Sequence, residues 1–334
     1  MKTIYRNGLV NDVPYFLEES DEFGIQELDG ERVTDRFAYQ GDSIKYDLDI
    51  ALVGLYDFFR DLIFEDVCQY YNELPSLPIW VQEAGQSSDM DISANEFAEL
   101  MEKSKVPNLY KHLYLVDCQF LIGTVQNLLC AMETAFIDYY RLISSFSLTD
   151  HFKSLTDQNG TIMNISMHST QASNAVETYF TKAYSILDLV CKICYELQYL
   201  RTEFNGYSKI KSADILWGTR KKLSINSTSG TVFENCELVS NIEAIRNEIV
   251  HNGTWELNPK IFIHFKNGEE IERFMLYPDM EQGHLATVKS RRHFFSSDKK
   301  INDVLPVIHM EFKQRLIATI DAIRSTYGNM QSEK

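Results

Sequence analysis

Apolar residues recur every three or four positions over several long stretches of the chain, the spacing of a helix with one buried face. This pattern predicts long helices at about 43–74, 109–146, 169–204 and 303–327, and a short helix beginning at Ser93. Pro75 and Pro78 end the first long helix, and Gly328 stands at the C-cap position of the last. Helices of this length predict an all-α fold, an antiparallel bundle.

Two other parts of the chain carry the signals of short strands. The first forty residues mix short apolar pieces with glycines and acidic runs, so we expect strands and turns there. Later, KIFIHFKNGEEIERFML places two strand-like runs about Asn267 and Gly268, the strongest short hairpin signal that a sequence offers. The expected fold is therefore a helical bundle with a small β-hairpin inserted near 260–277. The polar stretch 154–164, SLTDQNGTIMN, is expected to be a loop between helices.

These changes of pattern suggest a division of the chain near Pro107, which interrupts the helical periodicity. Residues 1–105 are expected to form an N-terminal arm and a helical extension. Residues 106–330 are expected to form the main bundle, including the hairpin insertion. We find no internal repeat and no low-complexity tract in the chain.

Composition agrees with an ordinary folded protein. The chain has 334 residues, of which 44% are hydrophobic, enough to bury a sizeable core. No apolar run reaches the roughly eighteen residues that a membrane span needs, and the start lacks the apolar core of a signal peptide. The expectation is a cytoplasmic protein with no membrane partner.

Net charge and cysteine spacing limit the ligands and metal sites that we expect. The net charge of −16 opposes indiscriminate nucleic-acid binding unless basic groups are gathered locally. Cys191 and Cys194 lie three apart in an apolar helical pattern without a second pair, which favours core packing over a metal site. The sequence also lacks an H-E-x-x-H spacing and a glycine-rich phosphate loop, so we expect no metal and no cofactor.

The most informative segment is EAIRNEIVHNG, residues 243–253, at the end of a helix expected to start near Thr231. On a helical projection Arg246 falls inside an apolar stripe, whereas Asn247 and His251 stack on a polar face beside it. One interpretation is structural: Arg246 pairs with a carboxylate, Glu243 or Glu248, and His251 finishes a helix whose C-terminus favours cations.

The other interpretation is catalytic. R-N-E-I-V-H at the end of a helix, followed by one more long helix, resembles the HEPN (higher eukaryote and prokaryote nucleotide-binding) superfamily, over about residues 109–328. The resemblance implies a metal-independent ribonuclease that works as a homodimer, with Arg246 and His251 catalytic and Asn247 supporting them. It also implies RNA as substrate, and an antitoxin or regulatory protein as a possible partner in toxin-antitoxin or phage-defence biology. Many HEPN toxins carry a tyrosine two residues after the histidine, where this chain has Gly253.

The residue types fit that chemistry independently of the family. Cleavage of RNA by its own 2′-hydroxyl needs a proton acceptor that titrates near neutrality and a cation against the phosphate. Histidine and arginine supply these groups, and the planar guanidinium can hold two phosphate oxygens. The alternative function is a non-catalytic HEPN-like module that binds nucleotide, RNA or a partner protein through the same groove.

A second candidate is the basic segment 288–300, VKSRRHFFSSDKK. It gathers cations around two phenylalanines in an otherwise acidic chain, and we expect Lys289, Arg291 and Arg292 to bind substrate phosphates. The alternative is a solvated loop whose phenylalanines anchor it to the core. Trp255, just after the motif, is expected to be a core residue.

Overall fold

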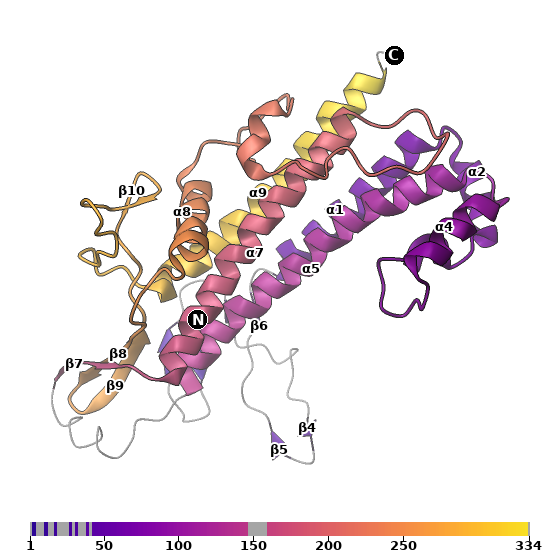
Figure 1. The fold of residues 1–334 in the computed structure, drawn as a ribbon. Coiled ribbons are helices and arrows are strands. Elements are labelled where there is room, and N and C mark those ends of the chain that lie inside the picture. Colours follow the sequence, from indigo (N-terminus) through magenta and orange to yellow (C-terminus); the bar gives the residue numbers. More distant parts are fainter. Residues whose placement is uncertain are drawn as a thin grey trace. The chain divides into compact units, whose positions relative to one another are not determined.

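The computed structural model describes residues 2–4, 10–12, 17–18, 27–28, 31–32, 38–39, 42–145 and 159–332. Within these residues the protein is mostly helical with small antiparallel sheets, as the apolar periodicity predicted (Figure 1). The helices are α1 (Asp42–Ile63), α2 (Val67–Glu73), η1 (Leu74–Ser76), α3 (Trp80–Glu83), α4 (Ala94–Lys103), α5 (Leu109–Ser145), α7 (Met167–Gln198), η2 (Trp217–Lys222), α8 (Glu237–Asn252) and α9 (Ile301–Ser332).

Short strands occupy part of the first forty residues, and the remaining strands follow α5 and α8. They are β1 (Lys2–Ile4), β2 (Val10–Asp12), β3 (Leu17–Glu18), β4 (Glu27–Leu28), β5 (Glu31–Arg32), β6 (Ala38–Tyr39), β7 (Gly160–Asn164), β8 (Ile261–Lys266), β9 (Glu269–Phe274), β10 (Met280–Glu281) and β11 (His284–Leu285). The sheets are β1-β2, β3-β6, β4-β5, β7-β8-β9 and β10-β11, and every pairing is antiparallel.

Helix ends follow local chemistry. Ser93 caps α4 through its side chain, and Glu96 completes the expected capping box. The predicted helix 43–74 is instead two helices, because the Asp66 side chain accepts the Cys68 N–H and starts α2. The C-cap expected at Gly328 is also wrong, since α9 continues to Ser332 and the Phe58 ring packs over that glycine.

The hairpin expected about Asn267 and Gly268 is confirmed. These two residues have φ of 53° and 80°, the positive values that a type I′ turn requires, and they join β8 to β9. The loop expected at 154–164 is wrong over 160–164, where β7 adds a third strand to β8 (Figure 1). Because the partner strand is more than ninety residues away, with Asn164 opposite Ile261, no local pattern announces the pairing.

The chain divides into two compact units, each discontinuous in sequence. The first comprises 1–48, 128–185 and 234–317, and the second comprises 49–127, 186–233 and 318–334. Each has its own buried apolar side chains, such as Phe136 and Phe180 in the first and Phe59 and Cys194 in the second. Cys191 is also fully buried, so the expected core packing of the close cysteine pair is confirmed. The division near residue 105 stays a prediction.

One described helix, residues Leu109–Ile143 of α5, is long and apolar enough by length and composition to cross a membrane. The helix meets this test on its average hydropathy and still contains no uninterrupted apolar run of eighteen residues, so the expectation of no membrane partner stays a prediction. Of its most apolar window, 44% is buried inside the fold. The core helix of a soluble protein passes the same test, so this is weak support for a membrane span.

In the first unit, Arg273 on β9 anchors the three-stranded sheet to the helices. Its guanidinium is 2% exposed, pairs with Glu270 and donates to the carbonyl of Ile143 at 3.3 Å. Asn302, in the first turn of α9, donates to the Arg273 carbonyl at 2.9 Å and accepts the Tyr139 hydroxyl at 2.7 Å. The charge of this arginine is thus compensated inside the fold.

A buried histidine lies in the same interior. His309 on α9 is fully buried, stacks on the Phe136 ring at 4.6 Å and lies 3.3 Å from the Tyr179 hydroxyl. Burial, and then the positive charges of Lys313 and Lys45, lower the pKa of His309 well below its ordinary value. This imidazole is therefore neutral at physiological pH.

Candidate functional site

The helix that carries R-N-E-I-V-H is α8, which buries Leu238, Val239, Ile242 and Ile245 on one face. It begins at Glu237 and not near Thr231, because the Thr231 hydroxyl donates to the carbonyl of Thr228 and forms a local turn. The buried apolar stripe does not reach the end of the helix, since Val250 is 51% exposed. The last turn of α8 is consequently open to solvent on the side of Val250.

Arg246 lies half-buried at the edge of this stripe. Its guanidinium carbon stands 4.3 Å from the centre of the Tyr184 ring on α7, and Nη1 donates to the Asn247 Oδ1 at 3.0 Å. Within the described ranges Arg246 forms no ion pair, so the expected pairing with Glu243 or Glu248 is wrong. An aromatic face and an amide oxygen hold the guanidinium without neutralising its charge.

Asn247 connects Arg246 to the end of the helix. It is half-buried, and His251, four residues later on the same face, is exposed. Gly253 then ends α8 with φ of 92°, a left-handed conformation that strains any residue with a Cβ, and its N–H bonds the carbonyl of Ile249 at 3.0 Å. Beyond it, the Thr254 hydroxyl donates to Glu177 on α7 at 2.6 Å and fixes the chain after the histidine.

Glu248, between the motif residues, is buried and ties α8 to the basic segment. Its carboxylate accepts Arg292 Nη1 at 3.2 Å and the side-chain amide of Asn252 at 3.0 Å, and the His293 Nε2 lies 3.2 Å from its other oxygen. Arg292 is therefore engaged within the protein. The sequence placed Glu248 only as a candidate partner of Arg246.

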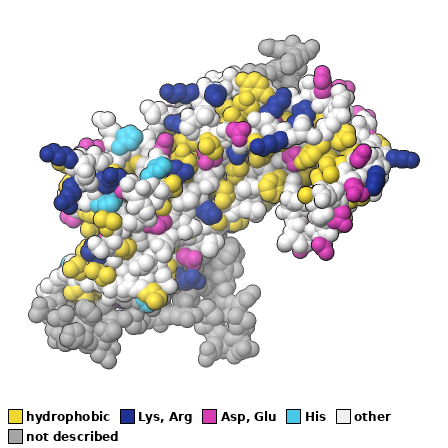
Figure 2. Space-filling view, in the orientation of Figure 1, with side chains coloured by type: hydrophobic (Ala, Val, Ile, Leu, Met, Phe, Trp, Pro, Cys, Tyr) yellow, Lys and Arg dark blue, Asp and Glu magenta, His cyan; other side chains and the backbone are white. Residues whose placement is uncertain are grey.

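Two other cations of the basic segment face solvent, whereas Lys300 pairs with Glu272 at 2.6 Å. Lys289 and Arg291 are exposed, and Phe294 is 37% exposed. Figure 2 shows basic and histidine side chains gathered over the region of β10 and α8. The structure thus keeps Lys289 and Arg291 available to an anion, whereas Arg292 already pairs with a carboxylate; their role as substrate-binding residues stays a prediction.

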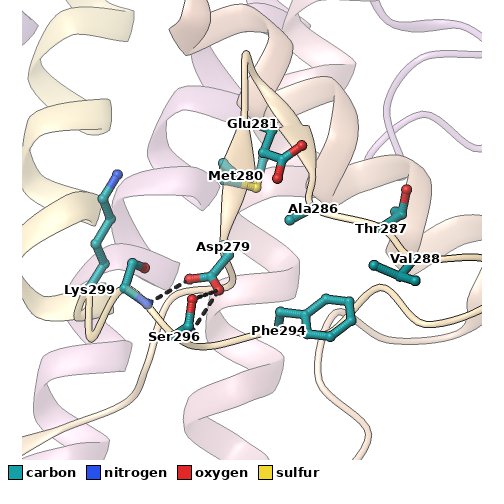
Figure 3. A pocket seen from close by; sticks show the side chains of 10 residues that line it. Asp279, Met280, Glu281, Ala286, Thr287, Val288, Phe294, Ser296 and Lys299 are labelled. Atoms are coloured by element: carbon teal, nitrogen blue, oxygen red, sulfur yellow. Dashed lines mark hydrogen bonds between the residues drawn. The ribbon is translucent and has the colours of Figure 1, made fainter.

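A cavity of about 350 Å³ opens beside this segment, between the β10-β11 hairpin and the loop that follows it (Figure 3). Asp279, Glu281, Val288 and Phe294 are among its lining residues. The turn of this hairpin lies close against α8, because a Cβ on Gly283 would lie 2.3 Å from the Cβ of Ser240 on that helix. The hairpin therefore packs directly on the helix that carries the motif.

Asp279 holds one wall of the cavity in shape. Its carboxylate accepts the N–H and hydroxyl of Ser296, both at 2.7 Å, and the N–H of Ser297 at 2.9 Å. Burial raises the pKa of Asp279, but the hydrogen bonds from Ser297 and Ser296 outweigh it and hold the pKa well below its usual range. The carboxylate stays ionised, and the loop around Ser296 is pinned to β10.

Two important residues were not predicted as members of the site. Tyr184 lies on a different helix and carries no signal that connects it with Arg246. Glu248 did carry one, because it follows Ile245 by three positions and therefore falls on the buried face of α8. A carboxylate in that register needs a partner inside the protein, and Arg292 Nη1 and His293 Nε2 each lie 3.2 Å from one of its oxygens.

Trp255 is 1% exposed, as expected of a core residue. Over the part of the chain that the structure describes, no three His, Cys, Asp or Glu side chains are grouped so that they could hold a metal ion. Comparison with known proteins adds no assignment: no protein-family model, no curated protein and no solved structure matches the chain.

Proposed function

We propose that the protein is a metal-independent endoribonuclease of the HEPN type, with Arg246, Asn247 and His251 as its catalytic residues. The observation that carries the proposal is the environment of Arg246. The guanidinium is half-buried and oriented by Tyr184 and Asn247, yet no carboxylate compensates its charge among the described residues. A structural arginine would be expected to have such a partner.

The position of His251 supports the same assignment. It lies on the last turn of α8, exposed, one turn after the amide that holds Arg246. An exposed imidazole can accept a proton from a substrate hydroxyl and return it, and a guanidinium can stabilise charge on the phosphate. Both groups come from one short helical segment that Gly253 and Thr254 fix at its end.

The reaction follows from these groups. His251 takes the proton of a ribose 2′-hydroxyl, the 2′-oxygen attacks the adjacent phosphorus, and the bond to the 5′-oxygen breaks. Arg246 stabilises the charge on the non-bridging oxygens. An acid on the opposite side must protonate the leaving 5′-oxygen, and the products are a 2′,3′-cyclic phosphate and a 5′-hydroxyl.

One motif contributes a single histidine, so the functional unit in this proposal is a two-fold homodimer. A second R-N-E-I-V-H segment facing the first supplies the acid, and a self-complementary interface is the usual way to bring two copies of one segment together. A role in toxin-antitoxin or phage-defence biology, with an antitoxin or regulatory protein as partner, rests on analogy with the family.

The test is RNA cleavage in the presence of EDTA. We expect the wild-type protein to leave 2′,3′-cyclic phosphate ends, and Arg246→Ala and His251→Ala each to lower the cleavage rate by about 100-fold or more. Light scattering of the same sample should report twice the chain mass of 38.7 kDa. His284→Ala is the matched control, because it removes another exposed histidine and should retain activity.

Each result bears on a separate part of the proposal. Cleavage that survives unchanged in His251→Ala contradicts the catalytic assignment. A strictly monomeric protein that still cuts RNA contradicts the shared site. Binding of RNA by the wild type without cleavage identifies the alternative, a non-catalytic module that binds RNA.

A further inference from the structure

We propose that the cavity between β10-β11 and the basic segment is a specificity pocket for one unpaired RNA base, guanine. This inference rests on the proposed ribonuclease function and extends it to the choice of substrate. At about 350 Å³ the cavity falls near the lower end of the range of about 300–1,000 Å³ typical of small-ligand sites. It suits a single base better than a large ligand.

The walls of the cavity have the two features that recognise a base. Phe294 offers an aromatic face that is 37% exposed, and unpaired RNA bases stack on such faces. Glu281 offers a carboxylate that forms no ion pair or hydrogen bond within the described residues. Figure 3 shows the Glu281 side chain and the Phe294 ring on opposite sides of the hollow.

The carboxylate selects among the bases. Guanine presents two adjacent N–H donors, N1–H and the 2-amino group, which one carboxylate can accept together. Adenine and cytosine place an unprotonated ring nitrogen beside their amino group, and it repels the carboxylate. Uracil presents a single N–H between two carbonyl oxygens. Glu281 therefore favours guanine over the other three bases.

The second acidic residue of the cavity does not compete for the base. Asp279 already accepts three hydrogen bonds from Ser296 and Ser297, which occupy most of the roughly four acceptor sites of a carboxylate and hold the loop that carries Phe294. The Phe294 carbonyl also accepts the Asp279 N–H at 2.7 Å. Its aromatic face is thereby attached to a rigid frame before any ligand arrives.

The cavity and its rim differ in charge, so they suit different parts of an RNA strand. Two carboxylates, Asp279 and Glu281, line the cavity against one cation, Lys299, so the balance of charge disfavours a phosphate there and favours the donor edge of a base. Lys289 and Arg291, exposed on the neighbouring loop, can hold the phosphates on either side of that base. The segment is connected to α8 by the pairing of Arg292 with Glu248, so the bound strand would lie beside the catalytic motif.

The experiment measures binding without cleavage. Fluorescein-labelled oligouridine with a 2′-O-methyl backbone, which lacks the attacking hydroxyl, carries guanine, adenine, cytosine, uracil or hypoxanthine at one central position. By fluorescence anisotropy we expect the guanine strand to bind about tenfold more tightly than the adenine, cytosine and uracil strands. The hypoxanthine strand, which keeps N1–H but lacks the 2-amino group, should bind with intermediate affinity.

Substitutions of Glu281 and Phe294 test the two walls of the cavity one at a time. Glu281→Gln should abolish the preference for guanine, and Phe294→Ala should weaken the guanine strand about tenfold, whereas Phe294→Tyr keeps the aromatic face and the affinity. The controls are Glu203→Gln and Phe120→Ala, which make the same changes at exposed positions outside the cavity. Both controls should bind like the wild type.

The outcomes distinguish this inference from the proposed activity. Equal affinity for all five strands, or wild-type binding by both Glu281→Gln and Phe294→Ala, overturns the pocket even if the protein cleaves ordinary RNA. A preference for guanine that depends on Glu281 and Phe294 supports the pocket even if ordinary RNA is not cleaved.

Discussion

Two regions of the first unit each contain an arginine and a histidine, and they treat these residues in opposite ways. In one region, Arg273 on β9 is paired with Glu270, and His309 on α9 is fully buried with a lowered pKa. At the end of α8, Arg246 has an aromatic ring and an amide for neighbours, and His251 is exposed. We call these the interior region and the α8 end.

The difference shows what to look for in a candidate site. Arginine and histidine are equally present in both regions, so residue type does not separate a structural role from a functional one. The treatment of charge does: the interior region pairs Arg273 with Glu270 and keeps His309 neutral, whereas the α8 end orients Arg246 without a carboxylate partner among the described residues. An orientated but uncompensated charge is free to act on a ligand.

The largest expected effect tests the contrast between the arginines. Arg273→Met leaves the Glu270 carboxylate without its partner, and we expect it to lower the free energy of unfolding by about 3–5 kcal/mol. Arg246→Met, the matched change at the α8 end, should cost about 1 kcal/mol or less, because among the described residues it removes one cation–π contact and one hydrogen bond. Urea unfolding followed by circular dichroism measures both, and similar losses would abolish the distinction.

The contrast between the histidines predicts a pH dependence of stability. The folded state lowers the pKa of His309, so its favourable contribution is complete above the ordinary pKa and is lost as pH falls below about 6.5. The free energy of unfolding should decline there by up to about 1.4 kcal/mol per pH unit from this group.

The measurement compares urea unfolding of the wild type and His309→Gln between neutral and mildly acidic pH. The variant should lose part of the slope that the wild type shows. If His309→Gln leaves the slope unchanged, another group is responsible for it.

The smallest expected effect concerns the orientation of Arg246. Tyr184→Leu removes the ring beneath the guanidinium, a contact of about 0.5–1 kcal/mol, and should lower kcat/KM for RNA by about two- to fivefold. Tyr184→Phe keeps the ring and should retain activity. Steady-state cleavage assays of the two variants decide the matter, and equal rates in Leu and Phe variants would show that the ring does not position Arg246.

The parts of the fold that could be predicted are those with local causes. Residues close in sequence form the capping box of Ser93 and Glu96 and the turn at Asn267 and Gly268. A local sequence pattern is therefore enough to predict both. The strand β7 depends on β8, a distant partner, and was expected to be a loop. The break at Asp66 has a local cause, but the apolar pattern continues across it.

The candidate site divides in the same way. R-N-E-I-V-H and the basic segment are visible in the sequence, and so is the neighbourhood of Asn247 and His251 on one helix face. The partners of the charged groups on α8 cannot be seen in the sequence, because Tyr184 contacts Arg246, and Arg292 contacts Glu248, from other elements. Which of Glu243, Glu248 or a ring would face Arg246 depends on packing that the pattern leaves open.

The pairing of Arg292 with Glu248 has a consequence for measurements of ionic strength. Added salt weakens every ion pair that solvent reaches, and Arg292 is 37% exposed on this one. A salt titration of polyanion binding would therefore report two processes together, release of counterions from the polyanion and loosening of the protein's own loop from α8. The slope of log K for binding against log salt concentration would be steeper than the number of contacted phosphates predicts. In Arg292→Met, which lacks the ion pair, the slope should match that number.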